Sequence, residues 1–276
     1  MSEDSIGKNA KKMSMIAEKS SPVCDQATSL KRHDETLDVL YDGKVKLFQD
    51  RRGYRFSLDP LLLAHFMTCR RGENIADLGT GNGVIALTLA YLDSSLSITG
   101  VEIQPSMVDR AKRNVRMNGF QERITITRAD VRNIQETLRP ESFAAVVCNP
   151  PYRGTTSGRT SPNVERKIAR HEIAAGLADF LRAAAYLLPI KGRIAMVYPA
   201  LRIVDLLQSM RNMNLEPKRL RMVHSFAKTK ASLALVEAVK GGRSGSETLS
   251  PLVVYGESKQ YTTEVEAMLA GKPTLD

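Results

Sequence analysis

The sequence predicts an α/β fold with a mostly parallel sheet and helices on both of its faces. Two observations support this fold class. From residue 73 onward, short runs of apolar, β-favouring residues alternate with amphipathic stretches of helical spacing. A glycine-rich turn joins the first of these strands to the first helix, and acidic residues end successive strands. Short connections between such elements are typical of parallel strands joined by helical crossovers.

The alternation can be followed along the chain. Seven strands are expected, at "ENIADLG", "SLSITGVE", "RITITRAD", "FAAVVCN", "GRIAMVYP", "EPKRLRMVHSF" and "ASLALVEAV". Helices are expected at "GVIALTLAYL", "QPSMVDRAKRNVRMNG", "GLADFLRAAAYLL" and "ALRIVDLLQSMRNM". Upstream of these elements, "KVKLFQDRRGYRFSLDPLLLAHFM" predicts a short hairpin followed by a helix.

Composition suggests one domain behind a polar tail. Residues 1–37 have no hydrophobic period, which predicts a disordered tail, and residues 38–276 form a single domain that begins with the hairpin and helix. The N-terminus lacks an apolar core of signal-peptide length, and no apolar run approaches the ~20 residues that a membrane span needs. The cysteines Cys24, Cys69 and Cys148 lie far apart and outside any metal-binding motif. We therefore expect a cytoplasmic protein without a metal or membrane partner.

The net charge of +10 is concentrated in one part of the chain. Residues 151–230 carry 15 Lys and Arg against 5 Asp and Glu, whereas residues 1–40 and 231–276 are slightly acidic. Concentrated positive charge favours a polyanionic partner, because binding to phosphates releases counterions. The alternative is a solvated basic surface, and charge alone does not separate the two.

The turn in "ADLGTGNGVIALTLA" places Gly79, Gly81 and Gly83 between a strand and a helix. Such a turn lets a ligand approach the backbone next to a helix N-terminus. An ordinary strand-to-helix turn does not need three alternating glycines. The turn therefore predicts a site for a nucleotide-like cofactor.

Acidic residues distinguish between two such cofactors. A dinucleotide site has the spacing G-x-G-x-x-G with an acid about 20 residues further on. Here the spacing is G-x-G-x-G, and Asp77 precedes the glycines, while Glu102 and Asp130 end the next two strands. This much negative charge disfavours a pyrophosphate and favours a sulfonium with an ammonium group, and Glu102 could accept both ribose hydroxyls. The pattern favours S-adenosylmethionine over NAD.

The fourth strand ends in Asn149-Pro150-Pro151-Tyr152, at the same expected sheet edge. An exocyclic amine is a poor nucleophile, because its lone pair is delocalised into the ring. The Asn149 side-chain oxygen and the Pro150 carbonyl could accept the amine hydrogens and aim the lone pair, and Tyr152 could stack on the base. A simple strand-ending turn is the alternative interpretation, which the upstream glycines and acids disfavour.

In combination, "DLGTGNG", "VEI", "RAD" and "CNPPY" resemble the class I S-adenosylmethionine-dependent methyltransferases. The resemblance implies a Rossmann-like fold with a seven-stranded sheet, of which one strand beside "HSFAKTKA" is antiparallel. It assigns the acceptor pocket to Asn149, Pro150, Pro151 and Tyr152. Cofactor binding is expected of Asp77, Gly79, Thr80, Gly81, Gly83, Glu102, Ile103, Asp130, Val131 and Asn149. Phe56 could reach the methionine end of the cofactor or could pack the hairpin.

The segments on either side of these motifs indicate a more specific family within this class. "VKLFQDRRGYRFSLDPLLLAHF", "ARHEIA" and "SFAKTKASLALVEAVKGG" make the chain similar to the bacterial valine-tRNA adenine-N6-methyltransferases, which modify the adenine just 3′ of the anticodon. This implies tRNA as partner, with a monomer favoured and RNA contacts from Arg153, Arg159, Arg166, Lys167, Arg170, Lys218, Arg219, Lys228 and Lys230. The same tetrapeptide also occurs in enzymes that methylate a protein glutamine. That substrate, another RNA, and a non-catalytic RNA-binding role remain alternatives.

Overall fold

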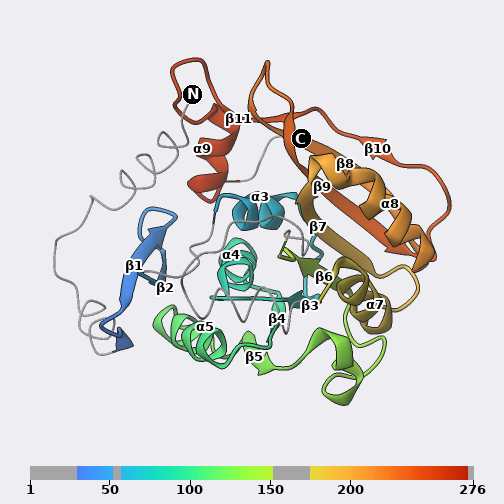
Figure 1. Ribbon diagram of the computed structural model, residues 1–276. Coiled ribbons are helices and arrows are strands. Elements are labelled where there is room, and N and C mark those ends of the chain that lie inside the picture. Colours follow the sequence, from blue (N-terminus) through green and yellow to red (C-terminus); the bar gives the residue numbers. More distant parts are fainter. Residues whose placement is uncertain (1–29, 52–56, 152–174, 273–276) are drawn as a thin grey trace, which may run out of the picture.

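A computed structural model describes residues 30–51, 57–151 and 175–272. Its main sheet has nine strands, in the order β10-β8-β9-β7-β6-β3-β4-β5, with β11 also paired to β8 (Figure 1). The strands are β3 (Asn74–Leu78), β4 (Ser97–Glu102), β5 (Ile124–Arg128), β6 (Ala145–Cys148), β7 (Arg193–Pro199), β8 (Leu215–Phe226), β9 (Ala231–Lys240), β10 (Glu247–Thr248) and β11 (Leu252–Tyr255).

Strand directions confirm the predicted fold class and refine the strand count. Strands β3 to β7 pair in parallel, and β9 is antiparallel to both β7 and β8. The antiparallel strand is therefore the second of the two candidates. Seven strands correspond to the prediction, and the short strands β10 and β11 are additional, pairing in parallel with β8. They cover the backbone groups that β8 would otherwise present at an open edge.

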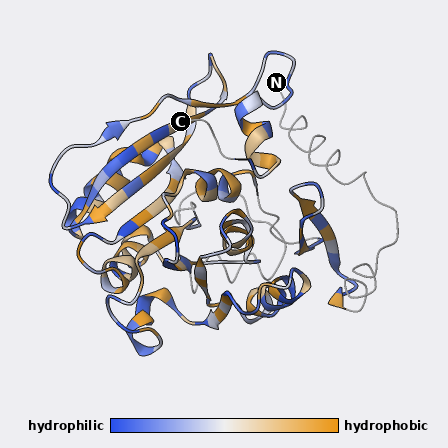
Figure 2. Cartoon of the chain, turned by 180° about the vertical axis from the view of Figure 1, so that it is seen from behind, coloured by the Kyte–Doolittle hydropathy of each residue, from blue (hydrophilic) through white to orange (hydrophobic). Residues whose placement is uncertain are grey.

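Two layers of helices cover the sheet. One face carries α3 (Asp59–Phe66), α4 (Val84–Leu92), α5 (Pro105–Met117) and α9 (Thr263–Leu269), and the other carries the 3₁₀ turn η1 (Val131–Glu136), α7 (Leu177–Leu187) and α8 (Ile203–Asn212). Successive strand residues alternate between the two cores, as Val146 and Val147 do. Figure 2 shows the hydrophobic residues gathered on the central strands and on the helices that cover them. Within the described residues, no helix is long and apolar enough to cross a membrane.

An antiparallel hairpin, β1 (Glu35–Leu40) with β2 (Val45–Asp50), lies apart from the main sheet and packs on α5 (Figure 1). This corrects the expected boundary of the polar tail at residue 37, since β1 begins at Glu35. It also corrects the expected hairpin, since β2 pairs with this upstream strand, which the sequence did not predict. The sequence suggested a tail because β1 is rich in acidic and polar residues. Its first residue is buried by charge pairing, which a hydrophobic pattern does not reveal.

The ion pairs of Glu35 hold the hairpin on α5. The Glu35 carboxylate is fully buried and accepts hydrogen bonds from Arg110 Nε at 2.8 Å and from Arg113 Nη1 at 2.7 Å. Burial alone would raise the pKa of the Glu35 carboxyl, but the hydrogen bonds from Arg113, Arg110 and the Arg32 backbone lower it to about 2. Glu35 is therefore charged in the folded protein at neutral pH, with two cations committed to it.

We expect Glu35→Gln to lower the free energy of unfolding by about 3 kcal/mol at pH 7, because two buried guanidinium groups lose their most buried counter-charge and keep only Asp50 and Asp109 as partners. The folded pKa is depressed, so this contribution is present above about pH 4.5 and is lost as the pH falls toward about 2. Urea unfolding across this pH range would measure it. Asp109→Asn is the matched control, since its half-exposed pair with Arg113 should contribute under about 1 kcal/mol. A Glu35→Gln deficit that stays constant on acidification would contradict the assignment.

Candidate active site

The glycine loop leaves β3 at the carboxyl edge of the sheet and leads into α4. Gly79, Gly81 and Gly83 have φ values of 73°, 56° and 84°, a left-handed region that favours glycine. The N–H groups of Gly79 and Thr80 both donate to the Val101 carbonyl, at 2.8 and 3.0 Å. These bonds hold the loop against β4. A side chain at Gly79 would in addition meet Phe180, whose ring lies 3.2 Å from the Cβ position.

Asp77 lies next to the end of β3 and is completely buried. Its Oδ2 accepts the Thr80 hydroxyl at 2.6 Å, while within the described residues its buried Oδ1 has no hydrogen-bond partner. Burial raises the pKa of the Asp77 carboxyl to about 7, against the opposing effects of the Thr80 hydroxyl and the Ala86 backbone N–H. A buried carboxylate with an unused oxygen favours a cationic ligand, which would stabilise its charged form.

Glu102 ends β4 and fixes the glycine loop from the other side. Its Oε2 accepts the Gly81 N–H at 3.1 Å and its Oε1 accepts the Gln104 N–H at 2.9 Å. Burial raises the pKa of its carboxyl, and these two N–H groups oppose the rise. Each carboxylate oxygen can accept more than one hydrogen bond, so Glu102 keeps the capacity to bind hydroxyls. The neighbouring Ile103 is half-buried.

Asp130 follows β5 and is more exposed than the other two acids. Its Oδ1 accepts the Arg132 N–H at 2.9 Å, which caps η1, and its Oδ2 pairs with Arg132 Nε at 2.8 Å. The guanidinium holds the pKa of the Asp130 carboxyl below its ordinary value. A ligand amine at Asp130 would therefore share this carboxylate with Arg132. Val131, also predicted at the site, is buried.

Asn149 and Pro150 follow β6 directly. Because Cys148 pairs with Leu78 of β3, Asn149 lies at the level where the glycine loop begins. Asn149 is half-buried, Pro150 is buried and Pro151 is exposed. The structure thus brings Asn149 to the edge that carries Asp77 and Glu102. Tyr152 and Phe56 lie outside the described residues.

Asn114 on α5 connects the hairpin to the glycine loop and was not predicted from the sequence. It is fully buried, accepts the Phe48 N–H at 2.6 Å and donates to the Asn82 carbonyl at 3.0 Å. Gln49 of the hairpin also lies 3.5 Å from the Asn82 amide. A polar residue within the apolar stripe of a helix was the available signal, because such a residue needs internal partners.

The described cations predicted to bind RNA fall into two groups. Lys228 and Lys230 are exposed in the turn between β8 and β9, at the same edge as Asn149. Lys218 and Arg219 lie near the opposite edge, where β8 begins. Lys218 donates to backbone carbonyls, and Arg219 donates to Thr68 Oγ1 at 2.6 Å and stacks on a phenylalanine ring.

Lys218 and Arg219 therefore contact groups of the protein itself, and their role in RNA binding stays a prediction. The remaining predicted cations lie outside the described residues: Arg153, Arg159, Arg166, Lys167 and Arg170. In the described part of the chain, no group of three or more His, Cys, Asp and Glu side chains is arranged to hold a metal ion.

Comparison with known proteins agrees with this geometry. The family model of the methyltransferase small domain matches residues 59–210. A protein of Actinobacillus succinogenes named tRNA1(Val) (adenine(37)-N6)-methyltransferase is 30% identical over 225 residues, which cover 78% of this chain and 88% of that protein. Proteins of the same name from Tolumonas auensis and Porphyromonas gingivalis are each 32% identical, over 55% and 49% of this chain. The matched part spans 62% and 52% of their own lengths.

Solved structures support the fold. A predicted O-methyltransferase from Agrobacterium tumefaciens superposes with a TM-score of 0.65 at 22% identity, covering 79% of this chain and 98% of that one. A type I restriction-modification methyltransferase subunit from Streptococcus thermophilus gives a TM-score of 0.55 at 17% identity, covering 81% and 53%. With the family model matched over residues 59–210, the chain belongs to the methyltransferase small domain family.

Proposed function

We propose that this protein transfers a methyl group from S-adenosylmethionine to the N6 amine of an adenine in tRNA. The observation that carries the proposal is the juxtaposition of Asp77, Glu102 and Asn149 at one edge of the sheet. The names of the relatives point to adenine 37 of a valine tRNA as the target. The concentration of positive charge in residues 151–230 agrees with an RNA substrate. The cytoplasm is the proposed place of action.

The acids suit the proposed cofactor. Bound S-adenosylmethionine would supply an electrophilic methyl group on a sulfonium. The unused Oδ1 of Asp77 is a suitable neighbour for the cationic methionine part, and Glu102 is suited to the ribose hydroxyls. Asp130 is the candidate for the adenine amine, which it would share with Arg132. The left-handed glycines leave the backbone of the loop open to the cofactor at Gly81, where a Cβ would meet no atom within 4 Å.

Asn149 and Pro150, which follow strand β6, are the residues that would bind the acceptor amine. Two acceptor oxygens, on the Asn149 side chain and the Pro150 backbone, would bind the two amine hydrogens and orient the lone pair toward the methyl group. The fixed φ of proline suits the second acceptor, because it holds the carbonyl in place. The chemistry needs positioning more than a strong base.

Methylation of a protein glutamine is the second candidate, since its amide nitrogen has the same conjugated lone pair. The tetrapeptide at Asn149 serves both substrates equally. Two exposed lysines at the catalytic edge, Lys228 and Lys230, favour a phosphate-bearing substrate over a protein loop.

We expect Asn149→Ala to lower methyl transfer at least about 100-fold, because the amine loses a positioned acceptor, while the Kd for the cofactor changes by less than about threefold. Asn149→Asp keeps an acceptor oxygen and should retain measurable activity. The assay supplies labelled S-adenosylmethionine with a valine tRNA transcript or with a release factor, followed by nucleoside digestion.

Label in the release factor alone, or a digest without N6-methyladenine, would overturn the proposed substrate. Full activity of Asn149→Ala would overturn the acceptor role. Binding of tRNA by a wild-type protein that neither binds the cofactor nor transfers methyl would instead support a non-catalytic role.

We expect Asp77→Asn to weaken cofactor binding at least about tenfold and to raise the stability of the cofactor-free protein at pH 8 by roughly 2 kcal/mol. The raised pKa means that burying Asp77 is favourable below about pH 4 and becomes unfavourable as the pH rises through about 7. The stability gain should therefore shrink on acidification. Urea unfolding at pH 8 and pH 5 measures it.

Asp130→Asn is the matched control for stability, because Arg132 lowers the pKa of that carboxyl and its removal should not stabilise the protein at pH 8. A variant at Asp77 that loses stability at pH 8 would contradict the assignment of a buried, destabilising charge.

A further inference from the structure

Two large apolar side chains are exposed beside the proposed acceptor pocket. Leu201, on the 3₁₀ turn η2 (Ala200–Arg202), is 98% exposed, and Val204, in the first turn of α8, is 71% exposed. Strand β7 pairs with β6 and ends at Pro199, so η2 extends beyond the same strand ends that carry Asn149. Burial of a leucine contributes about 1.5–3 kcal/mol in a folded protein, and Leu201 makes almost no such contribution here.

Exposed lysines border these apolar side chains. Turn η2 packs against β9, and Lys228 and Lys230 immediately precede that strand. In the described part of the chain, neither lysine forms an ion pair with a carboxylate. Arg202, by contrast, is held by Asp205 at 3.3 Å and lies over the Tyr198 ring. The two lysines are therefore the cations of this rim that remain available to a ligand.

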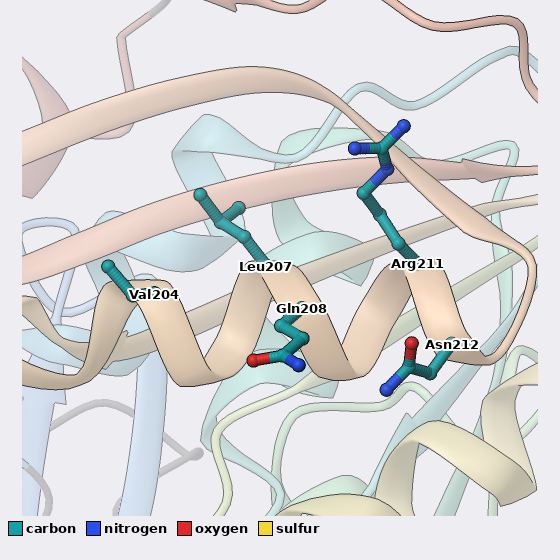
Figure 3. Close-up of a pocket in the computed structure, with 5 residues that line it drawn as sticks. All are labelled: Val204, Leu207, Gln208, Arg211 and Asn212. Atoms are coloured by element: carbon teal, nitrogen blue, oxygen red, sulfur yellow. The ribbon is translucent and has the colours of Figure 1, made fainter.

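The apolar surface continues along α8. A surface hollow of about 500 Å³ is lined by Val204, Leu207, Gln208, Arg211 and Asn212 (Figure 3). In this view Val204, Leu207 and Arg211 project from one side of the helix, and Gln208 and Asn212 from another. At the end of the hollow farther from Asn149, Arg211 pairs with Glu216 at 3.0 Å. This end therefore carries little net charge and provides mainly hydrogen-bonding groups. At the end of the hollow nearest Asn149, the exposed lysines Lys228 and Lys230 therefore border the exposed apolar side chains of Leu201 and Val204.

We propose that Leu201 and Val204 form an apolar wedge that contacts the bases next to the target adenine, with Lys228 and Lys230 on the adjoining phosphates. The proposal rests on the RNA substrate proposed above. An adenine that enters the acceptor pocket must leave its stack, which costs a few kcal/mol and leaves neighbouring bases uncovered. Leucine side chains can fill such a gap, while lysines hold the backbone in register.

A wedge can be distinguished experimentally from a surface that simply binds RNA. Leu201 and Val204 should raise the rate of methylation only on an RNA in which the target base must first be unstacked. Leu201→Ser should therefore lower kcat/KM about tenfold on an anticodon stem-loop, and by less than about twofold on an unstructured oligonucleotide of the same loop sequence. Lys228→Ala with Lys230→Ala should weaken binding of both RNAs and reduce the slope of log Kd against log salt by about 1.4–1.8.

The opposite edge of the sheet offers matched controls. Ile190 is 57% exposed and is followed by the exposed Lys191, before β7 begins. Ile190→Ser and Lys191→Ala should leave methyl transfer and RNA binding unchanged. Urea unfolding of each variant completes the set, and Leu201→Ser should change the free energy of unfolding by less than about 0.5 kcal/mol.

Several outcomes would overturn the wedge. They are an unchanged rate for Leu201→Ser, an equal loss on both RNAs, or a loss of stability that would show Leu201 to be covered by its own chain. A dependence on Leu201 for binding a release factor but not RNA would assign the rim to a protein partner. A wild-type protein that binds tRNA through Leu201 and the lysines without methylating it would refute the proposed reaction and leave the rim as an RNA surface.

Discussion

The parallel direction of strands β3 to β6 is the constraint on which the site depends. Parallel strands end at one edge of the sheet, so residues far apart in the sequence meet there once the pairing is set. The pairing of Leu78 with Cys148, and of Leu78 with Val101, aligns Asp77, Glu102 and Asn149 around the glycine loop. The hydrogen bonds from Gly79 and Thr80 to Val101, and from Gly81 to Glu102, then fix the loop. The buried carboxylate of Asp77 is tolerated because this framework holds it in place.

Much of the fold could be predicted from the sequence, because alternating strands and helices carry strong periodic signals. All seven predicted strands are present. The hairpin differs from the expected one, because β2 pairs with β1, which lies upstream of the segment in which a hairpin was predicted. Strands β10 and β11 could not be predicted, since they are short and are stabilised by pairing with β8 rather than by their own pattern. Strand β1 was missed for a related reason, because its first residue, Glu35, is buried by two arginines that are distant in sequence.

In the site, too, residues that belong to a local sequence pattern could be predicted, whereas residues whose role depends on tertiary packing could not. Glycines and acids at strand ends could be identified, since each is defined by its place in a local pattern. The role of Asn114 and the internal contacts of Arg219 could not, because both depend on which elements pack together. Basic residues are the least predictable class, since an arginine can pair with internal acceptors as readily as with a phosphate.

The most direct test of the account is calorimetric titration of S-adenosylmethionine into the protein at pH 7, in two buffers with different ionisation enthalpies. A cation beside Asp77 would lower the pKa of that carboxyl from about 7, so binding should release part of a proton. We expect the measured heat to depend on the buffer more strongly in the wild type than in Asp77→Asn. Absence of binding, or the same buffer dependence in both proteins, would contradict it.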